Sequence, residues 1–129
     1  MKIFILEDNE SRIDIFLEQL AKEHELTVAK DIWEARTLWG PPYGIICLDH
    51  DLGGRIFVDS VEENTGFRFV KDLLQGPKVE GRIYVHSWNP DAGAMMIQQL
   101  VQAGCDAHRN YFGPSLFTAI QLYLDEINR

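Results

Sequence analysis

Acidic and imidazole side chains stand directly after three apolar segments of this chain. The segments cover residues 3–6, 45–48 and 83–85 and consist mainly of β-branched and aromatic side chains, as buried parallel strands do. The polar residues that follow them are Glu7, Asp8, Asp49, His50, Asp51 and His86. Open α/β sheets bind their ligands at the carboxyl ends of the strands. The spacing therefore predicts one site at which these side chains meet.

The carboxylates of this set are candidates for holding a divalent cation. Asp8 and Asp49 follow strands that we expect to be neighbours, and Mg²⁺ or Mn²⁺ prefers hard oxygen ligands. We expect the carboxylate pair of Glu7 and Asp8 to hold the ion together with Asp49, while Asp51 either joins them or faces solvent. Without a cation, carboxylates this close, including Glu7, raise one another's pKa. The alternative is that Glu7 and Asp8 only complement the N-terminus of the next helix.

His50 and His86 end two neighbouring strands and can approach one pocket. Two imidazoles beside a phosphate make a general base and a general acid near neutral pH. Each histidine taken alone is equally consistent with a hydrogen-bonded core side chain. Their joint placement favours a catalytic part for at least one of them, together with Asp49 and Ser87.

Further residues can bind the phosphate or its substituent. Asn89 and Thr65 each open a helix, and helix N-termini bind phosphate through free N–H groups; helix capping alone also explains Asn89. Ser87 adds a hydroxyl, and Arg109 is the candidate cation, unless it is a surface arginine. Trp88 either stacks on a base or covers the sheet edge.

Five apolar strand segments alternate with five helical segments along residues 1–129. The expected strands are residues 2–7, 26–29, 43–48, 82–86 and 105–109, and the expected helices begin near Asn9, Asp31, Thr65, Asn89 and Ser115. Such alternation predicts a single α/β domain with a parallel sheet and helices on both faces.

The connection over residues 53–64 is longer than the roughly 2–6 residues usual in such units. Long loops beside strand ends often serve as lids. A lid and a decorative insertion are equally consistent with this segment, and residues 55–61 can also form a small hairpin.

The formal net charge of −8 excludes a large basic surface for a DNA duplex, although one nucleotide or an RNA end still fits with a few local cations. No apolar run approaches membrane-spanning length, and because a strand is predicted from residue 2 we expect no signal peptide. We therefore expect a cytoplasmic protein without a membrane partner. The oligomeric state stays open.

Several motifs resemble those of response-regulator receiver domains. They are Leu6-Glu7-Asp8-Asn9, Leu48-Asp49-His50-Asp51-Leu52, Thr65-Gly66-Phe67, Ser87 and Ala103-Gly104-Cys105-Asp106-Ala107. The resemblance implies a flavodoxin-like, receiver-like (βα)5 three-layer sandwich with sheet order 2-1-3-4-5. It also implies that Asp49 takes the place of the phospho-acceptor.

The chain departs from receivers where they carry a lysine followed by proline. Residues 108–113 contain no lysine, an ungapped match puts Tyr111 there, and Arg109 is nearby. Instead the chain resembles the cyclic-phosphate processing receiver domain family. The matching motifs are His50-Asp51-Leu52-Gly53, Thr65-Gly66 and His86-Ser87-Trp88-Asn89-Pro90, with Gly93 and Met96. The resemblance implies processing of cyclic phosphate ends in RNA repair and conflict systems.

We therefore expect a phosphoesterase that acts on a cyclic phosphate of an RNA end or nucleotide, in RNA repair or in nucleotide-signal processing. One histidine would activate water and the other would protonate the departing ribose oxygen. Asp49 could orient a histidine, bind a metal ion with Asp8, or act as a transient nucleophile. The alternatives are a signalling receiver phosphorylated on Asp49 and a non-catalytic interaction module.

Overall fold

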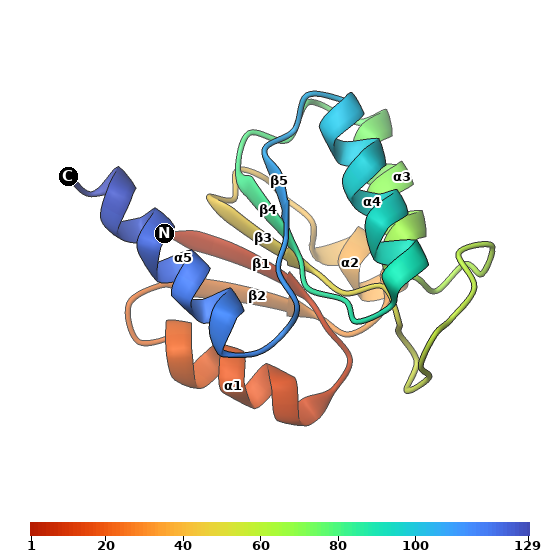
Figure 1. Cartoon of the computed structure of the whole chain (residues 1–129), viewed down its shortest axis with the longest axis horizontal. Coiled ribbons are helices and arrows are strands. Elements are labelled where there is room, and N and C mark those ends of the chain that lie inside the picture. The colour runs from red at the N-terminus through yellow and green to blue at the C-terminus, as the bar shows by residue number, and fades with distance from the viewer.

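A computed structural model describes all 129 residues and contains one five-stranded parallel sheet. The strands are β1 (Lys2–Leu6), β2 (Glu25–Ala29), β3 (Ile45–Leu48), β4 (Arg82–Val85) and β5 (Ala107–Arg109). Their order in the sheet is β2-β1-β3-β4-β5, and every neighbouring pair is parallel (Figure 1). The predicted flavodoxin-like α/β fold and its strand order are confirmed.

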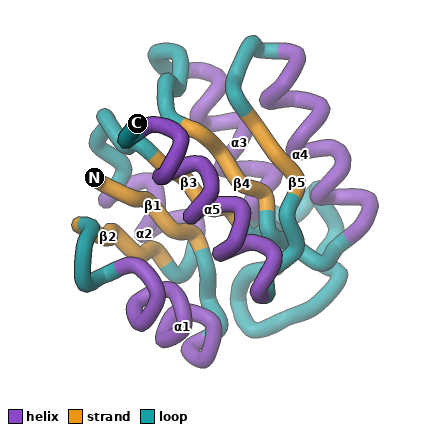
Figure 2. Tube along the Cα trace, turned by 60° about the vertical axis from the view of Figure 1, so that its left-hand side comes forward, coloured by secondary structure: helices purple, strands orange, loops and turns teal.

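Five helices cover the two faces of the sheet. They are α1 (Glu10–Leu20), α2 (Ile32–Leu38), α3 (Gly66–Gln75), α4 (Pro90–Gln102) and α5 (Pro114–Ile127). Helices α1 and α5 lie on one face and α2, α3 and α4 on the other (Figures 1 and 2). The first four begin at side-chain caps, Asn9, Asp31, Thr65 and Asn89, each of which accepts a backbone N–H three residues later. None of the five helices combines the length and the apolarity that crossing a membrane requires.

Strand alternation divides the core into two halves. Ile3 and Ile5 face the side of α1 and α5, whereas Phe4 and Leu6 face the other three helices. The strand register places Leu6 level with Leu48, which is in turn level with Val85. The residues that directly follow these three strands are Glu7, Asp49 and His86. They therefore point towards the side of α1 and α5 and lie level with one another.

The long connection leaves β3 and returns to α3 without forming a hairpin. Residues 53–64 contain no helix or strand, and an isolated antiparallel bridge between Asp51 and Thr65 closes the base of this loop. The loop extends beyond the carboxyl edge of the sheet (Figure 2). We call residues 53–64 the β3–α3 loop.

Candidate functional site

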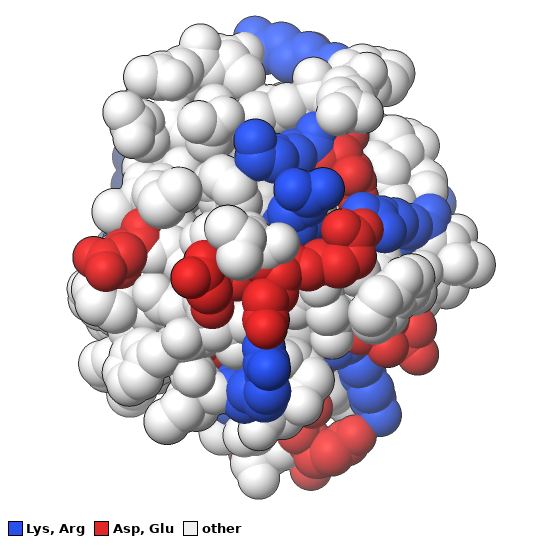
Figure 3. All heavy atoms as spheres, turned by 90° about the vertical axis from the view of Figure 1, so that its right-hand side faces the viewer, with Lys and Arg blue, Asp and Glu red and all other residues white.

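A pocket of about 390 Å³ lies between the carboxyl ends of the strands and the β3–α3 loop. Its lining consists of Glu7, Asp8, Asn9, Arg12, Asp49, Asp51, Gly54, Arg55, Ile56, Phe57 and Trp88. Figure 3 views the molecule from this end, where acidic side chains form a band with lysine or arginine side chains beside it. Four of the six polar residues that we expected to meet line this acidic cavity, and His50 and His86 do not.

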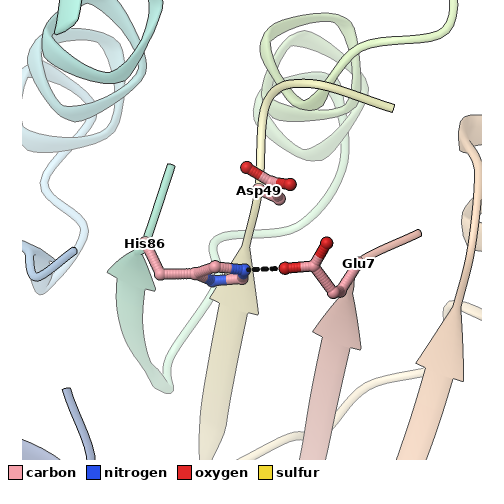
Figure 4. A group of neighbouring side chains, drawn as sticks. All are labelled: Glu7, Asp49 and His86. Atoms are coloured by element: carbon pink, nitrogen blue, oxygen red, sulfur yellow. Dashed lines mark hydrogen bonds and ion pairs between the residues drawn. The ribbon is translucent and has the colours of Figure 1, made fainter. Parts of the chain in front are cut away.

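Both carboxylate oxygens of Glu7 have hydrogen-bond partners. Its Oε1 lies 3.0 Å from Nε2 of His86, and its Oε2 accepts the backbone N–H groups of Asp8 and Asn9 at 3.1 and 3.2 Å (Figure 4). Burial by itself would raise the pKa of Glu7, but the hydrogen bond and charge of His86, with help from Arg12, outweigh burial and lower this pKa. Glu7 therefore keeps a fixed negative charge at the base of the pocket.

Asp49 stands beside Glu7 with only 3% of its surface exposed. One oxygen, Oδ1, accepts the N–H of His50 at 2.9 Å, and no protein group donates to the other. Burial and then the charge of Glu7 raise the pKa of Asp49 well above its ordinary value. Ligand atoms of Glu7, Asp49 and His86 lie within 4.8 Å of one another, so a cation between the two carboxylates would relieve their repulsion.

His86 lies beside Glu7 and does not line the pocket. Its ring is fully buried and packs against Phe16 and Phe112, with distances between ring centroids of 5.4 and 6.1 Å. Nδ1 is buried without a partner, whereas Nε2 faces Glu7. We assign a proton to Nε2, so that this N–H donates a hydrogen bond to Glu7. His86 thus orients Glu7 through this hydrogen bond, in the way that residues hydrogen-bonded to metal ligands orient those ligands.

His50 has no ring nitrogen left for a ligand. Nε2 lies 2.8 Å from the carbonyl oxygen of Val58, and Nδ1 accepts the N–H of Phe67 at 3.2 Å. These two partners require a neutral ring that carries its proton on Nε2. Burial lowers the pKa of His50, which also favours the neutral ring. His50 therefore ties the β3–α3 loop to the start of α3, outside the pocket lining.

We predict that His50→Ala lowers the free energy of unfolding by about 2–4 kcal/mol, because the buried N–H of Phe67 loses its acceptor, the carbonyl oxygen of Val58 loses one of its two donors, and a cavity opens. Urea unfolding measures the change. The β3–α3 loop should also loosen, which trypsin would report as faster cleavage after Arg55. His108→Ala is the matched control, since His108 is 41% exposed and pairs only with Asp106. Equal effects of the two substitutions would contradict this role of His50.

Asp51 uses its carboxylate to hold the loop. Oδ2 accepts the N–H of Phe57 at 2.8 Å, while Oδ1 accepts the N–H of Val58 at 2.9 Å and the side-chain amide of Asn89 at 3.1 Å. Both oxygens that we expected to bind a cation or face solvent are thus engaged. Asp8, in contrast, accepts only the N–H of Gly54 on one oxygen, and burial raises its pKa. Of these two aspartates, Asp8 is the one whose second oxygen is free in the pocket.

Of the predicted phosphate-binding residues, only Trp88 lines the pocket. The others form hydrogen bonds that stabilise the surrounding fold. Ser87 is buried, and its hydroxyl accepts the N–H of Asn89 at 3.0 Å. Thr65 is buried and caps α3. The Arg109 guanidinium lies against Gly93 and donates to the carbonyl oxygens of Ser87 and Asn89 at 2.8 and 3.2 Å. These contacts shape the turn after β4.

The cations of the pocket are Arg12 and Arg55. Arg12 lies 3.7 Å from Glu7 and over the ring of Phe112, and sequence reasoning missed it. A signal existed, because Arg12 occupies the first turn of the helix that Asn9 caps, directly after the acidic strand end. Arg55 comes from the loop and pairs with Glu62. Its position depends on the loop conformation, which the residue pattern does not specify.

Comparisons with known proteins agree with this architecture. The family model described as the cyclic-phosphate processing receiver domain matches residues 2–102. The non-phosphorylated receiver domain of HemR from Leptospira biflexa is similar in structure, with a TM-score of 0.70 and 20% identity over 98% of this chain and 92% of that one. A CheY-like receiver domain protein from Methanospirillum hungatei JF-1 has a TM-score of 0.64 and 17% identity over 97% and 94% of the two chains.

The Mn²⁺-bound form of the response regulator Rcp1 is also similar, with a TM-score of 0.61 and 18% identity over 93% of this chain and 88% of that one. At these identities the likeness to solved structures shows the fold alone. The comparison with curated proteins gives no match.

Proposed function

We propose that this chain, which belongs to the cyclic-phosphate processing receiver domain family, is a cation-dependent phosphoesterase that hydrolyses a cyclic phosphate on a nucleotide or an RNA end. The buried group of Glu7, Asp49 and His86 carries the proposal. Its carboxylates line a pocket that also contains Arg12 and Arg55. Carboxylates and arginines around one cavity are suited to phosphate-ester chemistry once a divalent cation is present.

The charge of the pocket supports a requirement for the cation. Four carboxylates face two guanidinium groups in its lining, so an anionic phosphate would be repelled from the cation-free pocket. Glu7 and Asp49 would hold Mg²⁺ or Mn²⁺, because Asp49 has a free oxygen beside the fixed charge of Glu7. The bound ion would polarise the phosphorus–oxygen bonds and neutralise the charge that develops on them.

The remaining pocket residues receive the following parts. Arg12 and Arg55 bind the non-bridging phosphate oxygens through charged hydrogen bonds. Asp8 takes the proton of the attacking water, since one of its oxygens is free and its raised pKa brings it closer to neutrality. The new bond joins the water oxygen to phosphorus, the bond from phosphorus to one ribose oxygen breaks, and that oxygen receives the proton. His86 and His50 act as positioning residues, through Glu7 and through the β3–α3 loop.

A phospho-accepting receiver is the second candidate function, and the free oxygen of Asp49 in the pocket favours it. The lysine that receivers carry after the fifth strand has no counterpart here, since Asn110 and Tyr111 follow β5 and Arg109 is bound to backbone carbonyls. Incubation with a small phosphodonor and Mg²⁺ would distinguish the two. A stable added phosphoryl group, lost in Asp49→Asn, would favour signalling.

The direct test is turnover of 2′,3′-cyclic nucleotides and of an RNA oligomer with a cyclic phosphate end, with Mg²⁺ or Mn²⁺ and with a chelator. The expected product has gained one water by mass spectrometry, and the chelator prevents its formation. Formation of no product from any of these substrates would reject the phosphoesterase.

We predict that His86→Ala lowers kcat by about 10–100-fold, because Glu7 loses the group that orients it and its charge is less well compensated. The turnover assay measures this loss, and unfolding by urea shows whether the variant is still folded. His86→Gln, which keeps a donor for Glu7, should recover part of the rate. Unchanged kcat in both variants would rule out the positioning role. His108→Ala serves as the surface control.

A further inference from the structure

An exposed aromatic stack stands at the rim of the pocket, next to the carboxylates. Trp88 lines the pocket, is 54% exposed, and stacks on Tyr111 with ring centroids 4.8 Å apart and an angle of 25° between the planes. A large aromatic ring left in solvent beside a polar cavity often marks a surface that a ligand covers. The outer surface of Trp88 is therefore available for stacking.

Arg109 supports the stack of Trp88 and Tyr111. The guanidinium of Arg109 lies 4.8 Å from the ring centroid of Tyr111 and is anchored by the carbonyl oxygens of Ser87 and Asn89. Gly93 makes room for it, since a Cβ at this position would lie 2.3 Å from the guanidinium carbon. Arg109, Tyr111 and Trp88 thus form a layered support that exists before any ligand binds, which reduces the entropy lost on binding.

A second aromatic ring faces the same cavity from the β3–α3 loop. Phe57 lines the pocket, is 65% exposed, and has a φ of 51°, in the left-handed region that a bulky side chain rarely adopts. Asp51 holds this conformation by accepting the N–H groups of Phe57 and Val58. The same carboxylate accepts the side-chain amide of Asn89, the neighbour of Trp88. The half-buried carboxylate of Asp51 thus fixes the loop that carries Phe57 to the turn that carries Trp88.

The geometry points to a nucleobase-binding subsite, and this inference rests on the proposed function because the phosphate must lie at the carboxylates. We infer that Trp88, supported by Tyr111 and Arg109, and Phe57 bind the faces of the base whose ribose carries the cyclic phosphate. The cavity of about 390 Å³ falls in the range of small-molecule sites. Stacking tolerates every base because each has a π face, so we expect the subsite to require a base rather than one particular base.

Calorimetric binding in Mg²⁺ tests this subsite without turnover. The probes are a nucleoside 3′-phosphate, ribose 5-phosphate and inorganic phosphate. Stacking on one aromatic side chain corresponds to about a 10-fold or larger change in affinity. We expect the nucleotide to bind at least about 10-fold more tightly than either base-free probe, and Trp88→Ala to remove that advantage while leaving inorganic phosphate unaffected. Trp88→Phe should restore most of it, and Phe57→Ala should weaken nucleotide binding in the same selective way.

Trp33→Ala is the matched control, because Trp33 is 55% exposed but lies on α2, outside the pocket. A trinucleotide with a terminal 3′-phosphate is measured in parallel, since an RNA end and a free nucleotide present the same base and phosphate; Trp88→Ala must weaken both. Equal affinities for nucleotide and base-free probes, or equal effects of the Trp88 and Trp33 substitutions, would overturn the subsite. Selective nucleotide binding without hydrolysis of any cyclic phosphate would reject the phosphoesterase and keep the subsite.

Discussion

Asp49→Asn should abolish cation-dependent turnover and at the same time make the protein more stable. The native fold raises the pKa of Asp49, first through burial and then through the charge of Glu7. Folding therefore favours the protonated acid, and stability is lost as the pH rises from the ordinary pKa of an aspartate through the raised one. A neutral amide at position 49 avoids this loss of stability, so we expect the free energy of unfolding of Asp49→Asn to exceed that of the wild type at pH values above that range.

Urea unfolding with Mg²⁺, with Mn²⁺ and with a chelator separates the two effects of Asp49→Asn. A saturating cation should stabilise the wild type by about 2–3 kcal/mol, as expected at 100 times the dissociation constant, and should leave Asp49→Asn unchanged. Turnover should fall by about 1000-fold or more, because the cation and its charge stabilisation are lost together. Asp14→Asn is the control, an exposed aspartate on α1 away from the pocket. A variant less stable than the wild type in chelator would contradict this description of Asp49.

Gly66→Ala should damage the fold more than any exposed substitution. A Cβ at Gly66 would lie 1.8 Å from the carbonyl oxygen of Asp49 and 2.9 Å from Cα of His50. Both contacts are to backbone, so neither can be relieved by a side-chain rotation. The start of α3 would have to move away from the end of β3, which would also separate Phe67 from His50. We expect a loss of about 3 kcal/mol or more in the free energy of unfolding.

The control for this prediction is Gly76→Ala, at the other end of the same helix. Its nearest neighbour to a new Cβ is the carbonyl oxygen of Leu73 at 3.7 Å, and its φ of −98° suits any residue. This substitution should change stability by no more than about 0.5 kcal/mol. If Gly66→Ala were equally mild in thermal and urea unfolding, the close approach of α3 to β3 would not be a feature of the folded protein.

The two predictions concern one junction. Gly66 donates its N–H to the carbonyl oxygen of His50 at 3.0 Å, and the bridge between Asp51 and Thr65 lies beside it. Asp49 begins this junction, and its position in the pocket depends on how α3 returns to the sheet. Stability at the junction and chemistry in the pocket are therefore expected to change together in Gly66→Ala and in opposite directions in Asp49→Asn.

The residue pattern by itself determined the parallel sheet and the edge at which the polar residues collect, and the resemblance to receivers supplied the strand order. Short β-branched apolar runs such as 3–6 and 45–48, alternating with helical segments, are typical of parallel strands buried between two layers of helices. The caps Asn9, Thr65 and Asn89 mark the helix starts through a local hydrogen bond, which depends on three or four consecutive residues. Such local signals can be read without knowing the rest of the chain.

Only the tertiary structure decided which of those polar residues share the pocket. The register of β1, β3 and β4 puts Glu7, Asp49 and His86 level on one face, so Glu7 rather than Asp8 meets His86. The alternation of side chains along each strand could have indicated that face. Which residues lie next to one another across the sheet depends on the register of long-range strand pairing.

The β3–α3 loop decided the remaining positions. It engages Nε2 of His50 and both oxygens of Asp51, and it carries Arg55 and Phe57 to the pocket. Its path is set by single hydrogen bonds to residues distant in sequence. No residue pattern specifies such contacts, because a loop without periodic burial has no repeating signal in its sequence.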